Sequence, residues 1–318
     1  MNSSITVGLA QISPVWLNKA ATIKKMLDYI VTAAAQQCQL IAFGEALLPG
    51  YPFWVELTNG AAFNSSLQKE MYAHYAYQSI SIANGDLTPF CEIAKEKKIN
   101  IVLGFMERAD DRGGHSLYCS LTNINTDGKI EYVHRKLMPT YEERLVWAIG
   151  DGNGLQVRKL NDFTVGVLNC WENWMPLVRS TLYAQGEDLH IALWPGSVRN
   201  TSEITRFIAK ESRSYVLSVS SLLHKKDISP SLPVATEMLA KSDEWLADGG
   251  SCIAKPNGEW LLAPVQYEEG LFVQTLQHQA ILEERQNFDP SGHYARPDVL
   301  QLTVNRERQK LVHFKDEI

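Results

Sequence analysis

The stretch FTVGVLNCWENWMP at residues 163–176 contains the strongest structural signal in the chain. Its first six residues are apolar or β-branched, which predicts a short buried strand. The run 176–186 places apolar residues at helical spacing, starts with a proline and ends with a glycine, which predicts a helix. Cys170 therefore lies where a strand ends and a helix is about to begin, with Asn173 as the expected N-cap.

A thiol that faces the positive end of a helix dipole is well placed to ionise. Most cysteines in such positions are nevertheless small buried hydrophobic residues. A chemical role for Cys170 therefore needs support from the rest of the chain.

The composition is that of an ordinary globular protein, with 318 residues, a net charge of −6 and 45% hydrophobic residues. The mild acidity argues against nucleic acid as a partner. We expect no membrane association, because no stretch approaches the ~18 apolar residues of a membrane span. We also expect no signal peptide, since the first residues show neither a basic region nor a long apolar core.

Five cysteines are scattered along the chain, and none has Cys-x-x-Cys or zinc-ligand spacing. This pattern predicts reduced thiols in a cytoplasmic protein, and no metal site.

Apolar periodicity predicts alternating strands and helices followed by several hairpins. We expect residues 223–248, which are polar, to form an irregular surface excursion. There are too many hairpins for a doubly wound parallel fold, so two sheets, each covered by helices on its outer face, fit better. We expect one domain over residues 1–318. The predicted strands are 5–12, 40–43, 100–105, 118–124, 129–136, 163–168, 189–194, 216–220, 251–255, 260–262, 271–276 and 299–304, and the further helices are 17–37, 61–82, 87–97 and 202–214.

Three charged residues stand out by position. Glu45 directly follows a buried strand, where a carboxylate is either a loop hydrogen-bonder or a buried acid with a raised pKa. Lys136 shares a strand face with Tyr132 and His134, and an inward lysine needs an anionic partner or a catalytic role. From the pattern alone, a lysine at a fraying strand end is equally consistent. Glu143 lies between a glutamate and an arginine, which by composition indicates a solvated face.

Several other hydrolytic motifs are absent from the sequence. It contains no G-x-S-x-G elbow, no H-E-x-x-H and no P-loop. A Cys–His dyad stays open, because His134 or His190 could approach Cys170 in space.

Short sequence blocks along nearly the whole chain match one known family. The chain resembles the nitrilase superfamily, the carbon–nitrogen hydrolases that use a Glu-Lys-Cys triad, and within it the nitrilase branch. It departs from the usual pattern at Gly44, where proline is common, and at Trp174, where many relatives carry tyrosine. The blocks are FGEA at 43–46 with LPGYP at 48–52, HRKLMPT at 134–140, ERLVW at 143–147 with GDG at 150–152, NCWEN at 169–173 with MPL at 175–177, WPG at 194–196, and GHYARPD at 292–298.

The resemblance implies a role for each of four residues. Cys170 is the expected nucleophile, Glu45 the general base and Lys136 the cation that stabilises the intermediate. Glu143 matches the family's second glutamate, which outweighs the interpretation from composition. The implied fold is α/β, a four-layer αββα sandwich that becomes eight-layered on dimerisation. The protein is then a homodimer or larger homo-oligomer, the tail from about residue 289 contributes to oligomer contacts, and no cofactor or metal is needed.

The pair Trp171-Glu172 after the cysteine is typical of nitrilases. It implies hydrolysis of an organic nitrile to the carboxylic acid and ammonia through a cysteine thioimidate and thioester. The alternatives are an amidase or cyanide hydrolase with the same triad, or a catalytically silent oligomeric scaffold. We expect five residues at the substrate, although plain core packing is the alternative for the aromatic ones: Tyr51, Trp54, Trp171, Glu172 and Trp194.

An ammonium beside the thiol would change its ionisation. At a reference pKa of ~8.5, about 3% of a free thiol is ionised at pH 7. An ammonium at ~4 Å contributes roughly 4 kcal/mol at an effective dielectric of ~20. On this basis Lys136 is enough to make the thiolate the main form of Cys170. An ionised Glu45 nearby opposes part of this effect, so we expect Glu45 to act as a base that takes the thiol proton as attack occurs.

Overall fold

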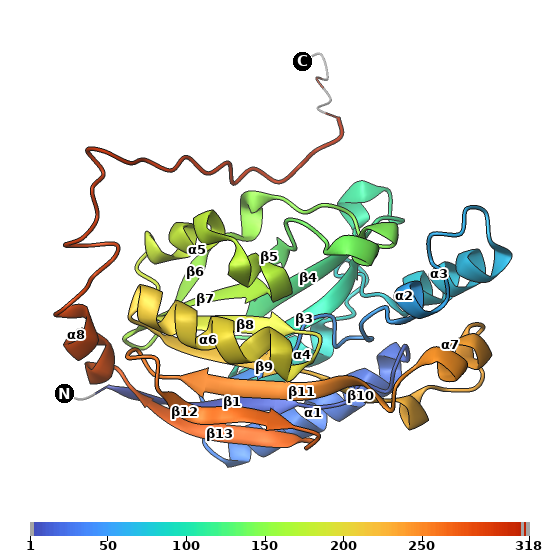
Figure 1. Ribbon diagram of the computed structural model, residues 1–318, viewed down its shortest axis with the longest axis horizontal. Helices are drawn as coiled ribbons and strands as arrows, with labels where there is room; N and C mark the ends of the chain where they lie inside the picture. The colour runs from blue at the N-terminus through green and yellow to red at the C-terminus, as the bar shows by residue number, and fades with distance from the viewer. Residues whose placement is uncertain (1–2, 313–314, 316–318) are drawn as a thin grey trace.

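Two β-sheets pack face to face, and helices cover the outer face of each (Figure 1). The computed structural model describes residues 3–312 and 315. Of the predicted 1–318 domain, residues 1–2, 313–314 and 316–318 lie outside the described residues. From edge to edge, the first sheet contains β13 (Gly270–Gln277), β1 (Ser4–Gln11), β2 (Leu40–Phe43), β3 (Asn100–Arg108), β4 (Leu117–Ile124) and β5 (Ile130–Arg135). The second contains β10 (Leu222–His224), β11 (Trp245–Ala254), β9 (Tyr215–Ser220), β8 (Leu189–Trp194), β7 (Phe163–Asn169) and β6 (Val157–Leu160), with β12 (Trp260–Gln266) paired to β11.

The helices form the two outer layers and one end of the molecule (Figure 1). Those on the first sheet are α1 (Lys19–Ala35) and α4 (Thr88–Lys97), and those on the second are α5 (Pro176–Tyr183) and α6 (Val198–Ser212). At one end lie α2 (Trp54–Leu57), α3 (Ser66–Gln78) and α7 (Ala235–Lys241), while α8 (Gln279–Arg285) follows β13. Short 3₁₀ helices are η1 (Asp110–Arg112), η2 (Tyr141–Leu145), η3 (Gly152–Gly154), η4 (Cys170–Trp174) and η5 (Lys225–Asp227).

The hydrophobic core has separate layers because the central strands are apolar on both faces. Leu9 of β1, Val167 of β7 and Ile191 of β8 belong to the cluster between the sheets. A second cluster joins the first sheet to its helices through residues such as Met26 and Ile30. Parallel strands buried on both faces require such continuous apolar runs. The predicted α/β fold with two helix-covered sheets is therefore confirmed.

The strand directions bring the ends of different strands together. β1, β2 and β3 run parallel in the first sheet, as β7, β8 and β9 do in the second. Glu45 follows the carboxyl end of β2, and Cys170 follows that of β7. The backbone N–H of Glu45 donates to the carbonyl of Trp194, the last residue of β8, at 3.1 Å. This bond joins the two sheets at the edge where Glu45 and Cys170 lie.

Residues 223–248 and 299–304 differ from the sequence prediction, which also did not include β6 and α8. Residues 223–248, expected to be irregular, contain part of β10, all of α7 and the start of β11. The pairing of β10 with β11 shifts register between Leu223 and His224, which interrupts the alternation of apolar and polar residues. Residues 299–304, expected to form a strand, have no strand conformation in the structure. They lie largely on the surface and pair with no strand among the described residues.

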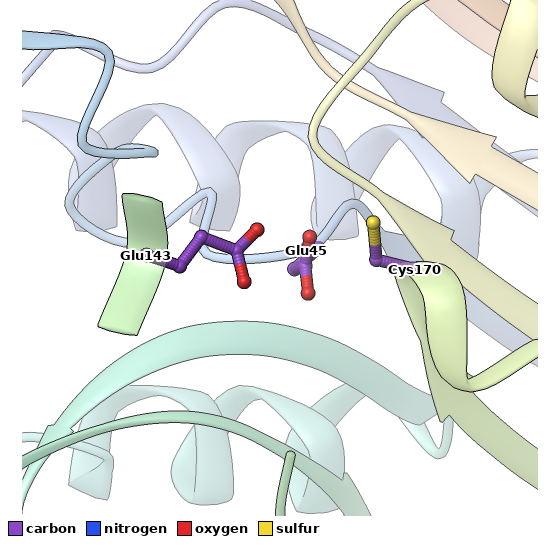
Figure 2. Close-up of side chains that lie close together, drawn as sticks. All are labelled: Glu45, Glu143 and Cys170. Atoms are coloured by element: carbon purple, nitrogen blue, oxygen red, sulfur yellow. The ribbon is translucent and has the colours of Figure 1, made fainter. Parts of the chain in front are cut away.

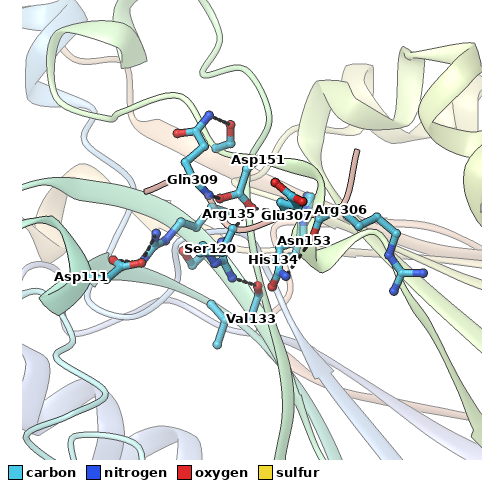
Figure 3. A network of polar contacts seen from close by, with 12 residues as sticks. Asp111, Ser120, Val133, His134, Arg135, Asp151, Asn153, Arg306, Glu307 and Gln309 are labelled. Carbon is cyan, nitrogen blue, oxygen red and sulfur yellow. Dashed lines mark hydrogen bonds and ion pairs between the residues drawn. The ribbon is translucent and has the colours of Figure 1, made fainter. Parts of the chain in front are cut away.

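After α8 the chain leaves the sandwich and runs along its outside (Figure 1). Its far end is fastened to the loop before η3 (Figure 3). The side chain of Arg308 pairs with Asp151 at 3.0 Å, and the backbone N–H of Gln309 donates to the same carboxylate at 3.0 Å. Arg308 also donates to the carbonyl of Val133 in β5 at 2.7 Å. In the part of the chain that the structure describes, no helix is long and apolar enough to cross a membrane.

Candidate active site

Four of the predicted residues meet in one buried cluster. The Sγ of Cys170 and one carboxylate oxygen from each of Glu45 and Glu143 lie within 4.8 Å of one another, with Glu45 between the other two (Figure 2). The Nζ of Lys136 lies 2.9 Å from Glu45 Oε1 and 2.7 Å from Glu143 Oε2. None of the four residues is more than 3% exposed. The structure thus brings together two carboxylates, an ammonium and a thiol away from bulk water.

Glu45 is positioned by a close approach of backbone segments. A Cβ on the preceding Gly44 would lie 2.5 Å from the Oγ of Ser221 and 2.8 Å from the carbonyl of Trp194. Only glycine fits there, so the departure from proline at this position has a steric reason. Ala46, directly after the glutamate, has a left-handed φ of 49°. Backbone strain of this kind is common at functional sites.

Lys136 follows the last residue of β5 and is held by its backbone. Its N–H donates to the carbonyl of Cys119 in β4 at 2.8 Å, and its carbonyl accepts from Gly150 at 2.9 Å. Tyr132 and His134 are buried with it, as the strand alternation predicts. Arg135, on the other face, is also buried, because it pairs with Glu107 at 2.6 Å.

Cys170 is the first residue of η4 and has a left-handed φ of 45°. Its carbonyl accepts from the Nδ2 of Asn173 at 2.7 Å. The prediction that Asn173 caps the following helix is wrong, since α5 begins after Met175 and has no side-chain cap. One extra 3₁₀ turn separates the cysteine from α5. The residue that caps this turn is Asn169.

Neither of the two candidate histidines forms a dyad with Cys170. The Nε2 of His190 is 2.7 Å from the Oδ1 of Asn173, and its Nδ1 is 2.9 Å from Glu187. The Nε2 of His134 is 2.9 Å from Glu172. Both rings are therefore engaged elsewhere, and the carboxylate of Glu45 is the group that lies beside the thiol.

The charges in the cluster overturn the expectation of a resting thiolate. Burial, reinforced by the neighbouring Glu45, raises the pKa of Cys170 well above its usual value, and Lys136 offsets only part of this. The ammonium is already paired with two carboxylates, so a thiolate would add a third negative charge to a dry site. Burial also raises the pKa of Glu45 to about 7, with Glu143 reinforcing and Lys136 opposing the shift. Burial alone would lower the pKa of Lys136, but the surrounding acids raise it well above its usual value.

A cavity of about 1100 Å³ leads to this cluster. Tyr51 and Trp171, two of the five predicted substrate residues, line it together with Cys170 and Glu143. Tyr51 also donates a hydrogen bond from its hydroxyl to Glu143 Oε1 at 2.7 Å.

The other three predicted substrate residues are not among those that line the cavity. Trp54 packs edge-on against Tyr75 with ring centroids 4.7 Å apart, and Trp194 donates to the Oγ of Ser218 at 3.1 Å. The carboxylate of Glu172 is turned toward His134. All three are at most 1% exposed, so we assign them to packing and internal hydrogen bonding instead.

A family model described as carbon-nitrogen hydrolase matches residues 6–286. The chain belongs to the carbon-nitrogen hydrolase family. It is 34% identical to an arylacetonitrilase of Aspergillus kawachii over 96% of this chain and 93% of that protein. It is 32% identical to Nitrilase 2 of Arabidopsis thaliana over 98% of this chain and 91% of that protein. Among solved structures, a mutant of the amidase from Nesterenkonia sp. AN1 superposes with a TM-score of 0.65 at 16% identity, over 89% of this chain and 97% of that chain, which shows the shared fold.

This carbon-nitrogen hydrolase has further cavity residues that no sequence pattern indicated. The aromatic ones are Phe53, Trp245 and Tyr267. Trp245 begins β11, within the segment that was expected to be irregular. Trp174, a departure from the family pattern, is 44% exposed and is not among the lining residues.

The donor atoms of Glu45, Glu143 and Cys170 are of types that also bind metal ions. In this hydrolase the ammonium of Lys136 contacts both carboxylates and supplies the positive charge between them. The arrangement can therefore move a proton from the thiol to Glu45 and stabilise negative charge beside Lys136.

Proposed function

We propose that this carbon-nitrogen hydrolase is a nitrilase, which converts an organic nitrile to the carboxylic acid and ammonia. It would then be a hydrolase acting on carbon–nitrogen bonds other than peptide bonds. The observation that carries the proposal is the buried cluster in which Cys170, Glu45 and Lys136 meet at the end of an open cavity. The names of relatives that match nearly the whole chain support the nitrile as substrate.

The first step uses the neutral thiol and the ionised Glu45. A nitrile carbon is a modest electrophile, and sulfur is a strong nucleophile once its proton is removed. As the S–C bond forms and one nitrile π bond breaks, Glu45 takes the thiol proton and passes it to nitrogen. A base with a pKa of about 7 is well matched to this transfer. Lys136 stabilises the charge that develops on nitrogen.

The resulting thioimidate is hydrolysed in two steps. Glu45 activates a water, whose oxygen bonds to the thioimidate carbon and gives a tetrahedral intermediate. Glu45 passes the proton that it took from the water to nitrogen, then takes the hydroxyl proton and passes it to nitrogen as the C=O bond forms and the C–N bond breaks, so that ammonia leaves a thioester on Cys170. A second water breaks the C–S bond, which releases the acid and returns the thiol. If the C–S bond breaks before the C–N bond, the product is the amide.

The test is ammonia release from aliphatic, aromatic and arylaceto nitriles, with each matching amide and inorganic cyanide alongside. We expect the wild-type protein to hydrolyse nitriles. The variants Cys170→Ala and Lys136→Ala should lose this activity while circular dichroism shows that both are folded. Cys91→Ala is the matched control, since its thiol lies on α4, away from the cluster. Turnover of amides or cyanide alone would reassign the reaction to a related carbon–nitrogen hydrolase. Near-normal kcat in Lys136→Ala would refute the role of the ammonium.

We further propose that the protein is a single-domain homodimer or larger homo-oligomer, with the tail from about residue 289 at its contacts. Large apolar side chains are exposed on η4, α5 and α6, which form the outer layer of the second sheet. Such patches are typical of protein interfaces. Sedimentation velocity of the full chain tests this. The patch residues include Trp174, Met175, Leu177 and Phe207.

The five cysteines are all free, which supports a reducing, cytoplasmic location. The partner that the site needs is a small nitrile. The proposed reaction requires no cofactor or metal, because the thiol, carboxylate and ammonium supply the nucleophile, base and positive charge.

A further inference from the structure

We propose that Glu172 is a positioning residue that fixes the distance between the catalytic ammonium and the nucleophile. It does so by binding the backbone on both sides of the active site with one carboxylate. This inference rests on the proposed function, because it assigns Glu172 a part in the same reaction. It also replaces the expectation that Glu172 contacts the substrate.

The contacts of Glu172 join two segments that are remote in sequence. Its Oε1 accepts from the backbone N–H of Leu137 at 2.7 Å, and Leu137 directly follows Lys136. Its Oε2 accepts from the backbone N–H of Asn169 at 3.0 Å, and Asn169 directly precedes Cys170. One rigid, planar group therefore holds the neighbour of the ammonium and the neighbour of the thiol at the same time.

A third donor completes the site of this carboxylate. The Nε2 of His134 lies 2.9 and 3.0 Å from the two oxygens. Nδ1 of this ring has no hydrogen-bond partner among the described residues, and a proton on Nε2 points at Glu172. Burial would raise the pKa of Glu172, but His134 and the two backbone donors outweigh it and hold the pKa below its usual value. Glu172 is thus an ionised acceptor with three donors.

The sheets themselves do not provide this connection. Lys136 follows β5, at the edge of the first sheet, whereas Cys170 follows β7 in the second. β5 pairs with β4, and β7 pairs with β6 and β8, so no backbone ladder joins β5 to β7. Glu172 and His134 form a side-chain link across the gap, and both are at most 1% exposed. Small errors in the placement of reacting groups are costly, and an error of ~1 Å can reduce the rate about 100-fold.

The test is Glu172→Gln in the full chain, with active sites counted by single-turnover titration. Glutamine keeps the volume but has one acceptor oxygen, so it leaves at least one of the three donors unpaired. We expect kcat per active site to fall about 10- to 100-fold while KM stays within about threefold, because alignment is lost rather than substrate affinity. We also expect the rate at which iodoacetamide alkylates Cys170 to fall at least about fivefold, since the thiol no longer lies correctly beside its base.

Asp188→Asn is the matched control. Asp188 is a largely buried acid. Its carboxylate accepts from the backbone N–H of Thr164 at 2.6 Å and lies 3.2 Å from the Nε2 of His278. It lies just before β8, at the opposite end of the sheet from the active site. Loss of these bonds should lower the melting temperature of Asp188→Asn but leave kcat per active site and the alkylation rate within about twofold of wild type.

Several results would overturn the inference. A kcat per active site within twofold of wild type in Glu172→Gln would show that the link is dispensable. An equal loss in Asp188→Asn would show a general effect of buried acids. If Glu172→Gln does not fold, Glu172→Asp keeps the charge but is one methylene too short to reach both backbones, and wild-type kcat in that variant would also refute the inference. Should wild type hydrolyse no nitrile, the proposed function fails, but the alkylation rates still decide the role of Glu172.

Discussion

Replacing Glu143 by glutamine should move the acidic limb of the pH profile to lower pH. In wild type, Glu45 must be ionised to take the thiol proton, so activity should be lost as the pH falls through its pKa of about 7. The ionised fraction is then about 10% at pH 6 and about 1% at pH 5, and kcat/KM should follow it. Glu143 is one of the groups that hold this pKa up.

The geometry gives the size of the shift. Oxygens of Glu45 and Glu143 lie within 4.8 Å of each other. At that separation and an effective dielectric of ~20, two charges repel by about 3.5 kcal/mol, or roughly 2.5 pKa units. Without Glu143, Lys136 can also turn fully toward Glu45, which lowers the pKa further in the same direction. We therefore expect the limb to move down by about 2 units, close to the pKa of an ordinary glutamate.

The assay is kcat/KM for a neutral nitrile between pH 4.5 and 9, with the rate of alkylation of Cys170 measured in parallel. Glu143→Gln should also have a lower plateau of kcat/KM, because Glu143 contacts Lys136 and Tyr51. The position of the limb, and not the height of the plateau, is therefore the test. Glu142→Gln is the control, since its partly exposed carboxylate is screened and the limb should move by less than about 0.5 unit. A limb that stays at about 7 or rises in Glu143→Gln would refute the charge assignment.

Two further predictions concern the cavity. Tyr51→Phe removes the hydroxyl that donates to Glu143 at 2.7 Å, so we expect kcat/KM to fall about three- to tenfold in steady-state assays, with an unchanged circular dichroism spectrum. The cavity wall holds six acidic residues against two basic ones, so an aryl nitrile that carries a carboxylate should have kcat/KM at least about tenfold below its methyl ester at low salt. The difference should shrink as salt is added, and equal values for the two substrates at low salt would contradict this picture. The acidic residues are Glu56, Glu142, Glu143, Asp243, Glu244 and Asp248, and the basic ones Arg199 and Lys241.

The sequence was sufficient for the parts of the site that depend on strand ends. Glu45 and Cys170 each follow a run of apolar residues, and such runs predict buried strands from local pattern alone. Their partnership with Lys136 and Glu143 came from the family resemblance, since four separate segments contribute to the cluster. Glu143 illustrates this point, because its own neighbours, Glu142 and Arg144, indicate a solvated face while its side chain is 1% exposed.

Properties that depend on several charges together were not predictable. A lysine beside a thiol suggested a thiolate, but the pKa of Cys170 depends on how many carboxylates share that lysine. Likewise, Glu172 looked like a pocket residue because it lies two positions after the nucleophile. The direction of the Glu172 side chain is set by the 3₁₀ helix η4. This helix turns the carboxylate toward backbone N–H groups and places Trp171 at the cavity. A local sequence pattern does not distinguish these two directions.

The neutral resting thiol has a consequence for how the ammonium contributes to catalysis. A lysine that stabilised a resting thiolate would lower the energy of the ground state and make the sulfur a weaker nucleophile, since nucleophilicity falls with the pKa of the thiol. Here Glu45 and Glu143 carry two negative charges against the single positive charge of Lys136 before the reaction begins. When the thiol proton moves to Glu45, that carboxylate becomes neutral, and Lys136 is left paired with Glu143 alone at the moment when negative charge develops on the substrate nitrogen. The stabilisation is therefore greatest in the transition state, which is the condition for an interaction to raise kcat.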